Sequence, residues 1–211
     1  MPHIAYLFLR WCPGILGLLL RQKLYPYLLR QCGCGVLIGR FVDMINPRGI
    51  ALADNVILND GSRLDAGDGS GDEARIALGK GVFVGAFTTL TAGPGRIVIG
   101  EGGNIGSRCL ISAATDVLLA EHVLLAGYCS IGNPPGTASG DEPGQQASPG
   151  AAAGDSTSIG RGCWLGLRSH VAAGARIGEG TIVGAHARVV GSLPEYAIAV
   201  GRPAGVKRLR P

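Results

Sequence analysis

Histidine is the side chain in this sequence best suited to taking a proton near neutral pH, because the imidazole pKa lies close to that range. The chain contains four histidines: His3, His122, His170 and His186. His3 lies in the N-terminal tail. The spacing of the repeats described below places His122 and His186 at turns and His170 on an outward face, and we expect each of the three to be exposed. His122 is the strongest candidate base, because it lies one six-residue unit before a long insertion.

That insertion contains the adjacent acidic residues Asp141 and Glu142. A carboxylate can also act as a base, although its pKa is less well matched to neutral pH than that of imidazole. We therefore treat Asp141 and Glu142 as further candidates for the catalytic base.

The cysteines show no pattern of a metal or redox site. They are Cys12, Cys32, Cys34, Cys109, Cys129 and Cys163. No pair forms a CxxC motif, and none lies near a histidine at zinc-site spacing. Cys109, Cys129 and Cys163 fall on inward positions of the repeat, where they are expected to act as small buried hydrophobes. The sequence therefore predicts no metal site and a chain kept reduced in the cytoplasm.

The composition favours an all-β chain with many tight turns. Glycine accounts for 36 residues, 46% of residues are hydrophobic and only 5% are aromatic. This hydrophobic content argues against disorder. The net charge of +4 is modest, and residues 43–211 show neither a basic stripe nor interleaved aromatic residues. Nucleic-acid binding is therefore not expected.

Branched aliphatic residues recur at every sixth position near the C-terminus: Ile159, Leu165, Val171, Ile177, Val183 and Val189. The residues two positions earlier are all small: Thr157, Cys163, Ser169, Ala175, Thr181 and Ala187. Glycine commonly follows the aliphatic residue, where we expect the backbone to turn. Each unit predicts one short strand and a turn, and three units predict a triangular coil with the aliphatic side chain inside. Such coils bury their core only by stacking on one another.

The same period, less regular, extends back to Ile38 and divides the chain into three parts. Residues 1–35 are an apolar, basic extension, residues 36–193 are the stacked coils, and residues 194–211 are a tail. The period breaks at 65–75 and 132–158, which predicts two loops leaving the coils. The second is long and rich in Gly, Pro, Ser and Ala, and loops of that length within a compact domain are often functional.

The N-terminal extension predicts a short amphipathic helix. Residues 1–42 contain no acidic residue and five basic ones: Arg10, Arg21, Lys23, Arg30 and Arg40. Pro13 and Pro26 interrupt its apolar runs, which are too short to span a bilayer. The stretch also lacks the basic start and cleavage site of a signal peptide. Two hypotheses remain open and are compatible: the helix caps the first coil, or it rests on an anionic membrane surface.

Four segments carry a resemblance to a known family. They are LRQKLYPYLLRQCG, NPRGIALADNVILND, GRGCWLGLRSHVAAGARIGEGTIVGA and LPEYAIAVGRPAGVKRLR. With them the sequence resembles the hexapeptide-repeat acyltransferases, especially the O-acetyltransferases that modify sugars of cell-envelope polysaccharides. This resemblance implies an all-β, left-handed parallel β-helix with a short helical N-terminal extension. It also implies a homotrimer with each active site between two neighbouring prisms.

The resemblance further implies direct transfer from acetyl-CoA or another acyl-CoA to a hydroxyl of a sugar or lipid-linked sugar. The acyl-CoA would run along the coils. The matching cofactor-binding positions are Trp164, Gly166, Gly184, Ala185, Arg202 and Pro203. Backbone groups at Gly166, Gly184 and Ala185 would meet the pantetheine arm, Trp164 would lie beside it, and Arg202 with Pro203 would lie near the nucleotide.

The chain departs from the family at two places. The family histidine follows the coil that ends near Ile131, but residues 132–137 contain no histidine. Asp141, Glu142 and Pro143 do match the acidic stretch and proline that follow it in the family. A family lysine near the CoA phosphates is also missing at 190–192, where Arg188 and Lys207 are the nearest basic replacements.

Three hypotheses follow from these residues. The first is an active O-acyltransferase with a substitute base. The second is a catalytically inactive homologue that acts as a scaffold or binding subunit. The third is a zinc enzyme of the γ-carbonic-anhydrase type, which needs three converging histidines and is poorly matched by the spacing of His122, His170 and His186.

Overall fold

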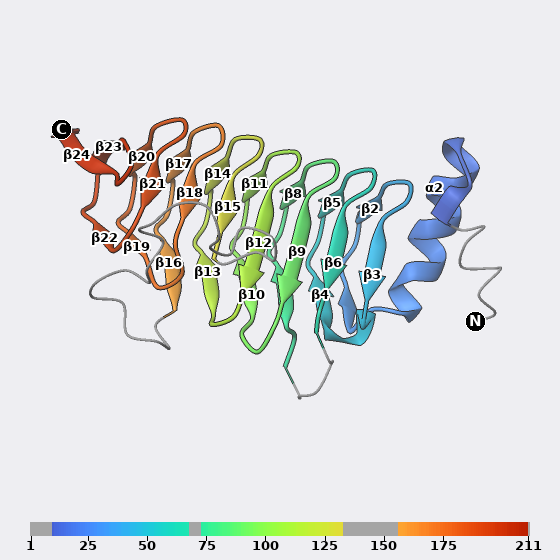
Figure 1. The fold of residues 1–211 in the computed structure, drawn as a ribbon. Helices are drawn as coiled ribbons and strands as arrows, with labels where there is room; N and C mark the ends of the chain where they lie inside the picture. The colour runs from blue at the N-terminus through green and yellow to red at the C-terminus, as the bar shows by residue number, and fades with distance from the viewer. Residues whose placement is uncertain (1–9, 68–72, 133–155, 211) are drawn as a thin grey trace, which may run out of the picture.

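The computed structural model describes residues 10–67, 73–132 and 156–210. They form an elongated prism whose three sides are parallel β-sheets, and a helix lies across its N-terminal end (Figure 1). We call the three sheets A, B and C. Each coil adds one strand to sheet A, then one to sheet B and one to sheet C, before the next coil begins. This arrangement is a left-handed parallel β-helix, so the fold class predicted from the sequence is confirmed.

The strands of each sheet follow one another along the prism. Sheet A contains β1 (Gln31–Cys32), β4 (Ile50–Leu52), β7 (Ile76–Leu78), β10 (Ile97–Ile99), β13 (Val117–Leu119), β16 (Thr157–Ile159), β19 (Arg176–Ile177) and β22 (Ser192–Leu193). Sheet B contains β2 (Leu37–Ile38), β5 (Ile57–Leu58), β8 (Phe83–Val84), β11 (Asn104–Ile105), β14 (Leu124–Leu125), β17 (Trp164–Leu165), β20 (Ile182–Val183), β23 (Ala197–Val200) and the antiparallel β24 (Gly205–Leu209). Sheet C contains β3 (Asp43–Ile45), β6 (Arg63–Asp65), β9 (Thr89–Ala92), β12 (Leu110–Ala113), β15 (Ser130–Ile131), β18 (His170–Val171) and β21 (Arg188–Val189).

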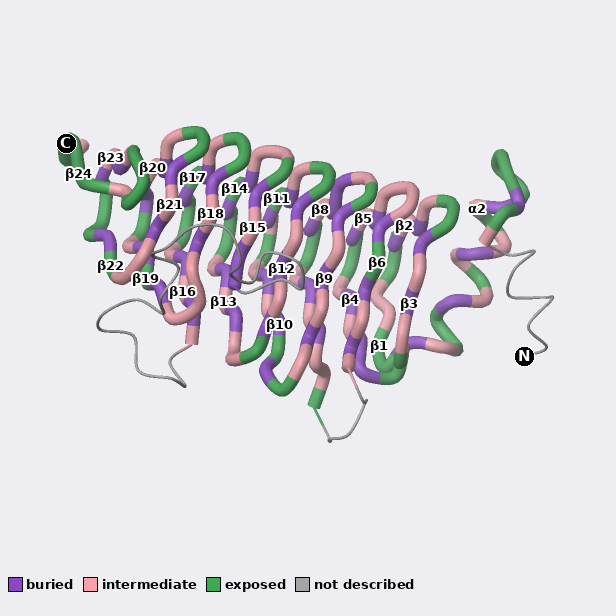
Figure 2. Tube along the Cα trace, in the orientation of Figure 1, coloured by how far each residue is buried: buried purple, intermediate pink, exposed green. Residues whose placement is uncertain are grey.

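The core is a set of aliphatic columns inside the prism. The side chains that recur every six residues all point inward and are at most 3% exposed: Ile159, Leu165, Val171, Ile177, Val183 and Val189. Figure 2 shows how buried and exposed positions alternate around the coils. Full burial of one such side chain contributes about 1.5–3 kcal/mol.

Small residues occupy the inward positions next to the corners, as the sequence predicts. Thr157, Cys163, Ser169, Ala175, Thr181 and Ala187 are all at most 1% exposed. Their polar atoms find backbone partners: the Thr181 hydroxyl donates to the Pro194 carbonyl at 2.6 Å, and the Gly174 amide donates to the Thr157 hydroxyl at 2.9 Å. Buried hydroxyls are tolerated here because they are hydrogen-bonded.

The glycine that follows the inward aliphatic residue has a packing role in addition to the predicted one. A Cβ on Gly166 would lie 2.6 Å from the Ala185 nitrogen of the next coil, and one on Gly160 would lie 2.6 Å from the Glu179 nitrogen. Positive φ instead occurs two residues later, at Gly162 and Arg168. The glycine is thus the first residue of the turn, as the sequence predicts, and Ser169 N–H donates to the Gly166 carbonyl at 3.1 Å across it. These glycines are also needed because successive coils approach too closely there for a side chain.

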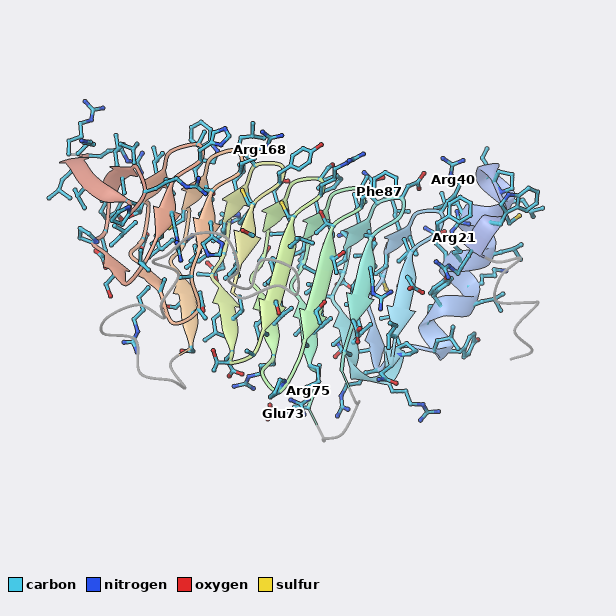
Figure 3. All side chains as sticks on the ribbon, in the orientation of Figure 1. Arg21, Arg40, Glu73, Arg75, Phe87 and Arg168 are labelled. Carbon is cyan, nitrogen blue, oxygen red and sulfur yellow. The ribbon has the colours of Figure 1, made fainter. Side chains whose placement is uncertain are left out.

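The corner between sheets B and C carries a column of stacked side chains with positive φ. It comprises Phe41, Phe87, Arg108, Tyr128, Arg168 and His186. The Arg108 guanidinium lies 5.5 Å from the Phe87 ring centroid and 5.8 Å from that of Tyr128, and Arg168 lies 5.4 Å from the Tyr128 centroid. Figure 3 shows Phe87 and Arg168 along this edge. Cation–π contacts of about 0.5–1 kcal/mol each offset part of the cost of positive φ at these residues.

Helix α2 (Gly14–Leu24) and the 3-10 turn η1 (Tyr25–Tyr27) cross the open end of the first coil. Arg21 is 2% exposed and points toward that coil (Figure 3), where its Nε donates to the Ile38 carbonyl at 2.8 Å. Gln22 donates to the Val36 carbonyl at 3.4 Å. These side chains supply donors that a preceding coil would otherwise provide. Among the described residues, no helix is long and apolar enough to cross a membrane.

The ladder of strands is longer at both ends than the predicted 36–193. β1 lies inside the range assigned to the N-terminal extension, and β23 lies inside the range assigned to the tail. The six-residue pattern does not reveal these two strands, because their inward residues are small. Cys32 pairs with Leu52, and Ala199 pairs with Val183, so each small residue takes a position that a branched aliphatic residue holds in the neighbouring coil.

The two loops predicted at 65–75 and 132–158 leave the ladder between sheets C and A. The first separates β6 from β7, and the 3-10 turn η2 (Pro47–Gly49) lies at the same corner one coil earlier. The second follows β15, and β16 already begins at Thr157. Residues 68–72 and 133–155 lie outside the described residues.

Candidate functional site

His170 lies on the outer face of sheet C, in the coil that follows the long insertion. Its neighbours in register are Ser130 on β15 and Arg188 on β21. Nδ1 of His170 is hydrogen-bonded to the Ser130 hydroxyl at 2.8 Å. The side chain is half-buried, whereas the sequence predicts an exposed one. This difference arises because strands on both sides, rather than solvent, flank the imidazole.

The surroundings of His170 keep its imidazole neutral. Burial lowers the pKa of His170, and the positive charges of Arg188 and Arg202 lower it further. Both arginines lower this pKa because their positive charges disfavour the protonated, cationic form of the imidazole. A neutral imidazole at pH 7 can accept a proton. If Nδ1–H donates to the Ser130 oxygen, Nε2 is the free acceptor.

Arg188 adds an unused donor beside this histidine. Its Nε is buried and has no hydrogen-bond partner within the described part of the chain. A buried unsatisfied donor is costly, and a bound ligand with an oxygen acceptor would remove that cost. The Ser130–His170–Arg188 row therefore combines a proton acceptor with a cationic donor on one outer face.

The insertion leaves the prism next to this row. Ser130 and Ile131 form β15, and the Gly132 amide donates to the Val171 carbonyl at 2.9 Å. The chain is therefore paired with β18 up to Gly132. The candidate bases Asp141 and Glu142 lie outside the described residues.

The other two candidate histidines lie elsewhere. His122 is exposed at the corner between sheets A and B, with φ 56°, and its ring packs over Gly102. His186 is exposed at the corner between sheets B and C, with φ 60°. Within one chain, His122, His170 and His186 do not converge, and the described residues contain no group of three side chains able to hold a metal ion.

Trp164 lies on a different face of the prism from His170. It is 51% exposed on the outside of sheet B, in register with Leu124 and Ile182. The corner at Gly166–Ser169 separates its strand from β18. A single chain therefore does not bring Trp164 and His170 onto one surface.

The backbone positions that match the pantetheine contacts are already used within the ladder. The Gly166 amide donates to the Val183 carbonyl, and the Gly184 amide donates to the Ala199 carbonyl, both at 2.8 Å. A Cβ on Gly184 would lie 2.6 Å from Cγ1 of Val200, so packing alone requires this glycine. Ala185 is exposed at the corner. The carbonyl oxygens of both glycines also accept within the chain, from Ser169 N–H at 3.1 Å for Gly166 and from Ala187 N–H at 3.2 Å for Gly184.

Arg202 and Pro203 are exposed in the turn between β23 and β24, and the bond joining them is cis. Two backbone hydrogen bonds hold this turn beside β21: Arg188 N–H to the Gly201 carbonyl at 2.9 Å, and Ala204 N–H to the Arg188 carbonyl at 2.7 Å. Among the predicted cofactor-binding residues, Arg202 is thus placed near enough to His170 to lower its pKa.

Comparison with known proteins bears on this arrangement. The bacterial transferase hexapeptide family (six repeats) matches residues 156–191, which include Trp164, His170 and Arg188. Residues 156–191 therefore carry the hexapeptide repeats of this family.

Two relatives resemble this chain in sequence. A probable acetyltransferase of Mycobacterium tuberculosis is 31% identical over 142 residues, covering 65% of this chain and 45% of the relative. The putative colanic acid biosynthesis acetyltransferase WcaF of Escherichia coli is 48% identical over 52 residues, covering 25% of this chain and 29% of WcaF. The chain thus spans less than half the length of either relative.

A solved structure shares the fold. AntD, an N-acyltransferase from Bacillus cereus crystallised as a point mutant with dTDP and coenzyme A, superposes with a TM-score of 0.58. The match covers 90% of each chain at 20% identity. A second point mutant of AntD, crystallised with dTDP-4-amino-4,6-dideoxyglucose and coenzyme A, gives the same TM-score at 21% identity, covering 90% of this chain and 89% of that one. At this identity the likeness establishes the β-helix and nothing about ligands.

Ser130 is the site residue that sequence reasoning missed. It precedes Ile131 by one position, so the six-residue register places it outward, but 40 residues separate it from His170. A pairing across the insertion becomes visible only if the inserted residues are removed and the coils on either side are aligned.

Proposed function

We propose that this chain transfers an acyl group, acetyl being the first expectation, from acyl-CoA to a hydroxyl of a cell-envelope sugar or polysaccharide precursor. The observation that carries the proposal is the neutral, half-buried His170, hydrogen-bonded to Ser130 at 2.8 Å within the matched repeats. It supplies a base although the family position at 132–137 has no histidine. The acetyltransferase names of both relatives support the reaction type.

In the proposed reaction, Nε2 of His170 removes the proton from the acceptor hydroxyl as the oxygen attacks the thioester carbonyl. The C–O bond forms, the C–S bond breaks, and the departing CoA thiolate takes the proton back from the imidazolium. Ser130 holds the ring through Nδ1, so that Nε2 faces outward. The Arg188 guanidinium beside the ring stabilises negative charge that develops on the carbonyl oxygen.

Acetyl-CoA is placed along the outside of sheet B. Trp164 offers a half-exposed aromatic surface there, and Arg202 offers a cation for the phosphates. Gly166, Gly184, Ala185 and Pro203 complete the predicted contact set. AntD binds coenzyme A on the same fold, which supports the assignment of the donor. No metal takes part in the proposed reaction.

A homotrimer would bring the two parts of the site together, because Trp164 and His170 lie on different faces of one prism. In a trimer, sheet B of one prism faces sheet C of its neighbour. The outer row of sheet B supports such a contact, since it presents mostly apolar side chains along the ladder: Ile57, Phe83, Leu124, Trp164, Ile182 and Ile198. Leu124 and Trp164 of this row are exposed and the other four are half-buried, and a continuous apolar row of this kind is typical of an interface.

We place the reaction in the cytoplasm, where the donor and reduced cysteines belong. A sugar nucleotide or lipid-linked sugar is the acceptor class that fits, and AntD, crystallised with a dTDP-linked amino sugar, supports a nucleotide-linked acceptor.

The decisive experiment is calorimetric titration of the full chain with acetyl-CoA, followed by measurement of free thiol released in the presence of nucleotide-linked sugars. Micromolar binding with acceptor-dependent thiol release is the expected result. Absence of binding at millimolar acetyl-CoA contradicts acetyl transfer. Binding without release from any acceptor favours the alternative, an inactive homologue that serves as a scaffold or binding subunit.

Trimer formation is tested separately by sedimentation velocity. A trimer that binds acetyl-CoA is expected. A monomer that binds acetyl-CoA would contradict the shared site while leaving acyl transfer in place, so the two parts of the proposal fail independently.

A further inference from the structure

Helix α2 buries an arginine and leaves several large apolar side chains exposed. Gly17 and Arg21 are its buried residues, and the half-buried Leu20 and Leu24 pack against the core. Large apolar residues on and just before the helix are open to solvent: Trp11 at 58%, Ile15 at 78%, Leu16 at 64% and Leu19 at 51%. A helix that simply covers a core in water has polar residues on its outer side, whereas the outer side of α2 is mainly apolar.

The burial of Arg21 follows from what the first coil needs. The open end of the prism presents backbone carbonyls, and Arg21 Nε donates to that of Ile38 at 2.8 Å. Its Nη1 donates to the Cys12 carbonyl, in the segment before the helix, at 2.9 Å. Hydrogen bonding of the coil end therefore draws the guanidinium inward. No equivalent requirement forces leucine and isoleucine outward, and leaving them in water forfeits their burial.

The exposed apolar residues form one surface with basic side chains beside them. Ile15, Leu19 and Lys23 are spaced by four residues, which places them along one side of the helix. Leu16 lies next to this row, and the exposed Tyr27 and Arg30 follow the helix. The exposed Trp11 precedes the helix. We call this set of seven residues the cap face. Aromatic residues and lysine or arginine around an apolar centre are typical of segments that lie at a membrane interface.

The charge of the segment favours a lipid surface over a second copy of the chain. Residues 10–42 contain no acidic residue, and Lys23 and Arg30 are the basic side chains of the cap face. The other three basic residues face the prism: Arg21 is buried, and Arg10 and Arg40 pair with Asp43 and Asp60. Two cap faces packed together would oppose like charges with no carboxylate from this segment between them. Anionic headgroups complement both the lysine and arginine side chains and the apolar centre.

We infer that the cap face docks on an anionic lipid surface, with Ile15, Leu16 and Leu19 entering the headgroup–acyl boundary and Lys23 and Arg30 meeting headgroup phosphates. The contact is interfacial, because α2 has 11 residues and is too short to span a bilayer. It lies at the opposite end of the prism from β24 (Figure 1).

The test is co-sedimentation of the full chain with vesicles of phosphatidylcholine alone or mixed with phosphatidylglycerol. We expect binding to the anionic vesicles, weaker binding to the neutral ones, and weakening by added salt through screening. Lack of binding to anionic vesicles overturns the inference.

Two pairs of variants locate the contact. Leu16→Ser with Leu19→Ser is expected to lower vesicle affinity at least about tenfold, whereas Leu209→Ser, exposed on β24 at the far end, leaves it unchanged. Lys23→Glu is expected to lower affinity about tenfold, and Lys80→Glu on the prism side is its control. Equal binding by each variant and its control overturns the inference.

Circular dichroism and thermal unfolding of every variant show whether folding is preserved, since all the changed side chains are exposed. End-to-end self-association of the wild-type chain, lost in the Leu16 and Leu19 variant and not accompanied by vesicle binding, would also overturn the inference and assign the cap face to a second copy.

Discussion

The Ser130 hydroxyl lies 2.8 Å from Nδ1 of His170, although 40 residues separate the two in the chain. The parallel pairing of β15 with β18 creates this contact, and the long insertion loops out between them. The looping out of the insertion thus brings a serine and a histidine onto one face, and in the proposed reaction this histidine is the base.

The first prediction concerns the identity of the base. His170→Asn is expected to lower kcat for acetyl transfer by about 10²–10⁴-fold, the usual contribution of a general base, with little change in acetyl-CoA affinity. His122→Asn, at an exposed corner, is the matched control and is expected to retain full activity. Steady-state thiol release measures both. The reverse result would restore His122 as the base.

Ser130 is expected to act through His170 by fixing its ring. Ser130→Ala should lower kcat about tenfold, the equivalent of one hydrogen bond, and Ser130→Thr should restore part of the loss. Unchanged kcat in Ser130→Ala would show that the hydrogen bond does not orient the base.

The second prediction concerns pH. Only neutral His170 accepts a proton, so activity is present above its folded-state pKa and is lost as pH falls through that value. Burial, Arg188 and Arg202 all lower this pKa below the ordinary histidine value, so the wild-type enzyme should remain active into mildly acidic solution.

Arg188→Met removes one of the positive charges and is expected to move the acidic limb of the kcat profile to higher pH. Arg176→Met, on sheet A, is the control that changes net charge equally. An acidic limb that stays in place in Arg188→Met would contradict the assignment of that limb to His170.

The part of the fold that could be predicted depends on a single period. A residue such as Leu165 is inward because every sixth position points into the prism, and the sequence carries that information directly. The contact of Gly166 with Ala185 depends on the distance between coils, which no period encodes, so the packing reason for that glycine could not be predicted.

The His170–Ser130 pair depends on how many residues the insertion removes from the ladder. The burial of Arg21 in α2 depends on the Ile38 carbonyl of the first coil, and that contact appears only in three dimensions.

The third prediction uses two adjacent residues of β17 that point to opposite sides. Leu165 is fully buried, and Leu165→Ala should lower the free energy of unfolding by about 2–5 kcal/mol. Trp164 is half exposed, and Trp164→Ala should leave stability nearly unchanged while weakening acetyl-CoA binding. Thermal unfolding and calorimetric titration separate the two effects. If Trp164→Ala binds acetyl-CoA normally, the tryptophan is not part of the donor site.

The fourth prediction tests the close approach of successive coils. Gly166→Ala places a Cβ 2.6 Å from the Ala185 nitrogen and 2.8 Å from the Gly184 carbonyl carbon, and neither backbone atom can move independently of its coil. Overpacking of this kind should lower the free energy of unfolding by about 1–3 kcal/mol. Gly205→Ala is the matched control, because nothing lies within 4 Å of its Cβ position, and it should unfold like the wild-type chain. Equal denaturation midpoints for the two variants would mean that the coils can separate locally at Gly166, and the packing reason given for the repeated glycine would then be wrong.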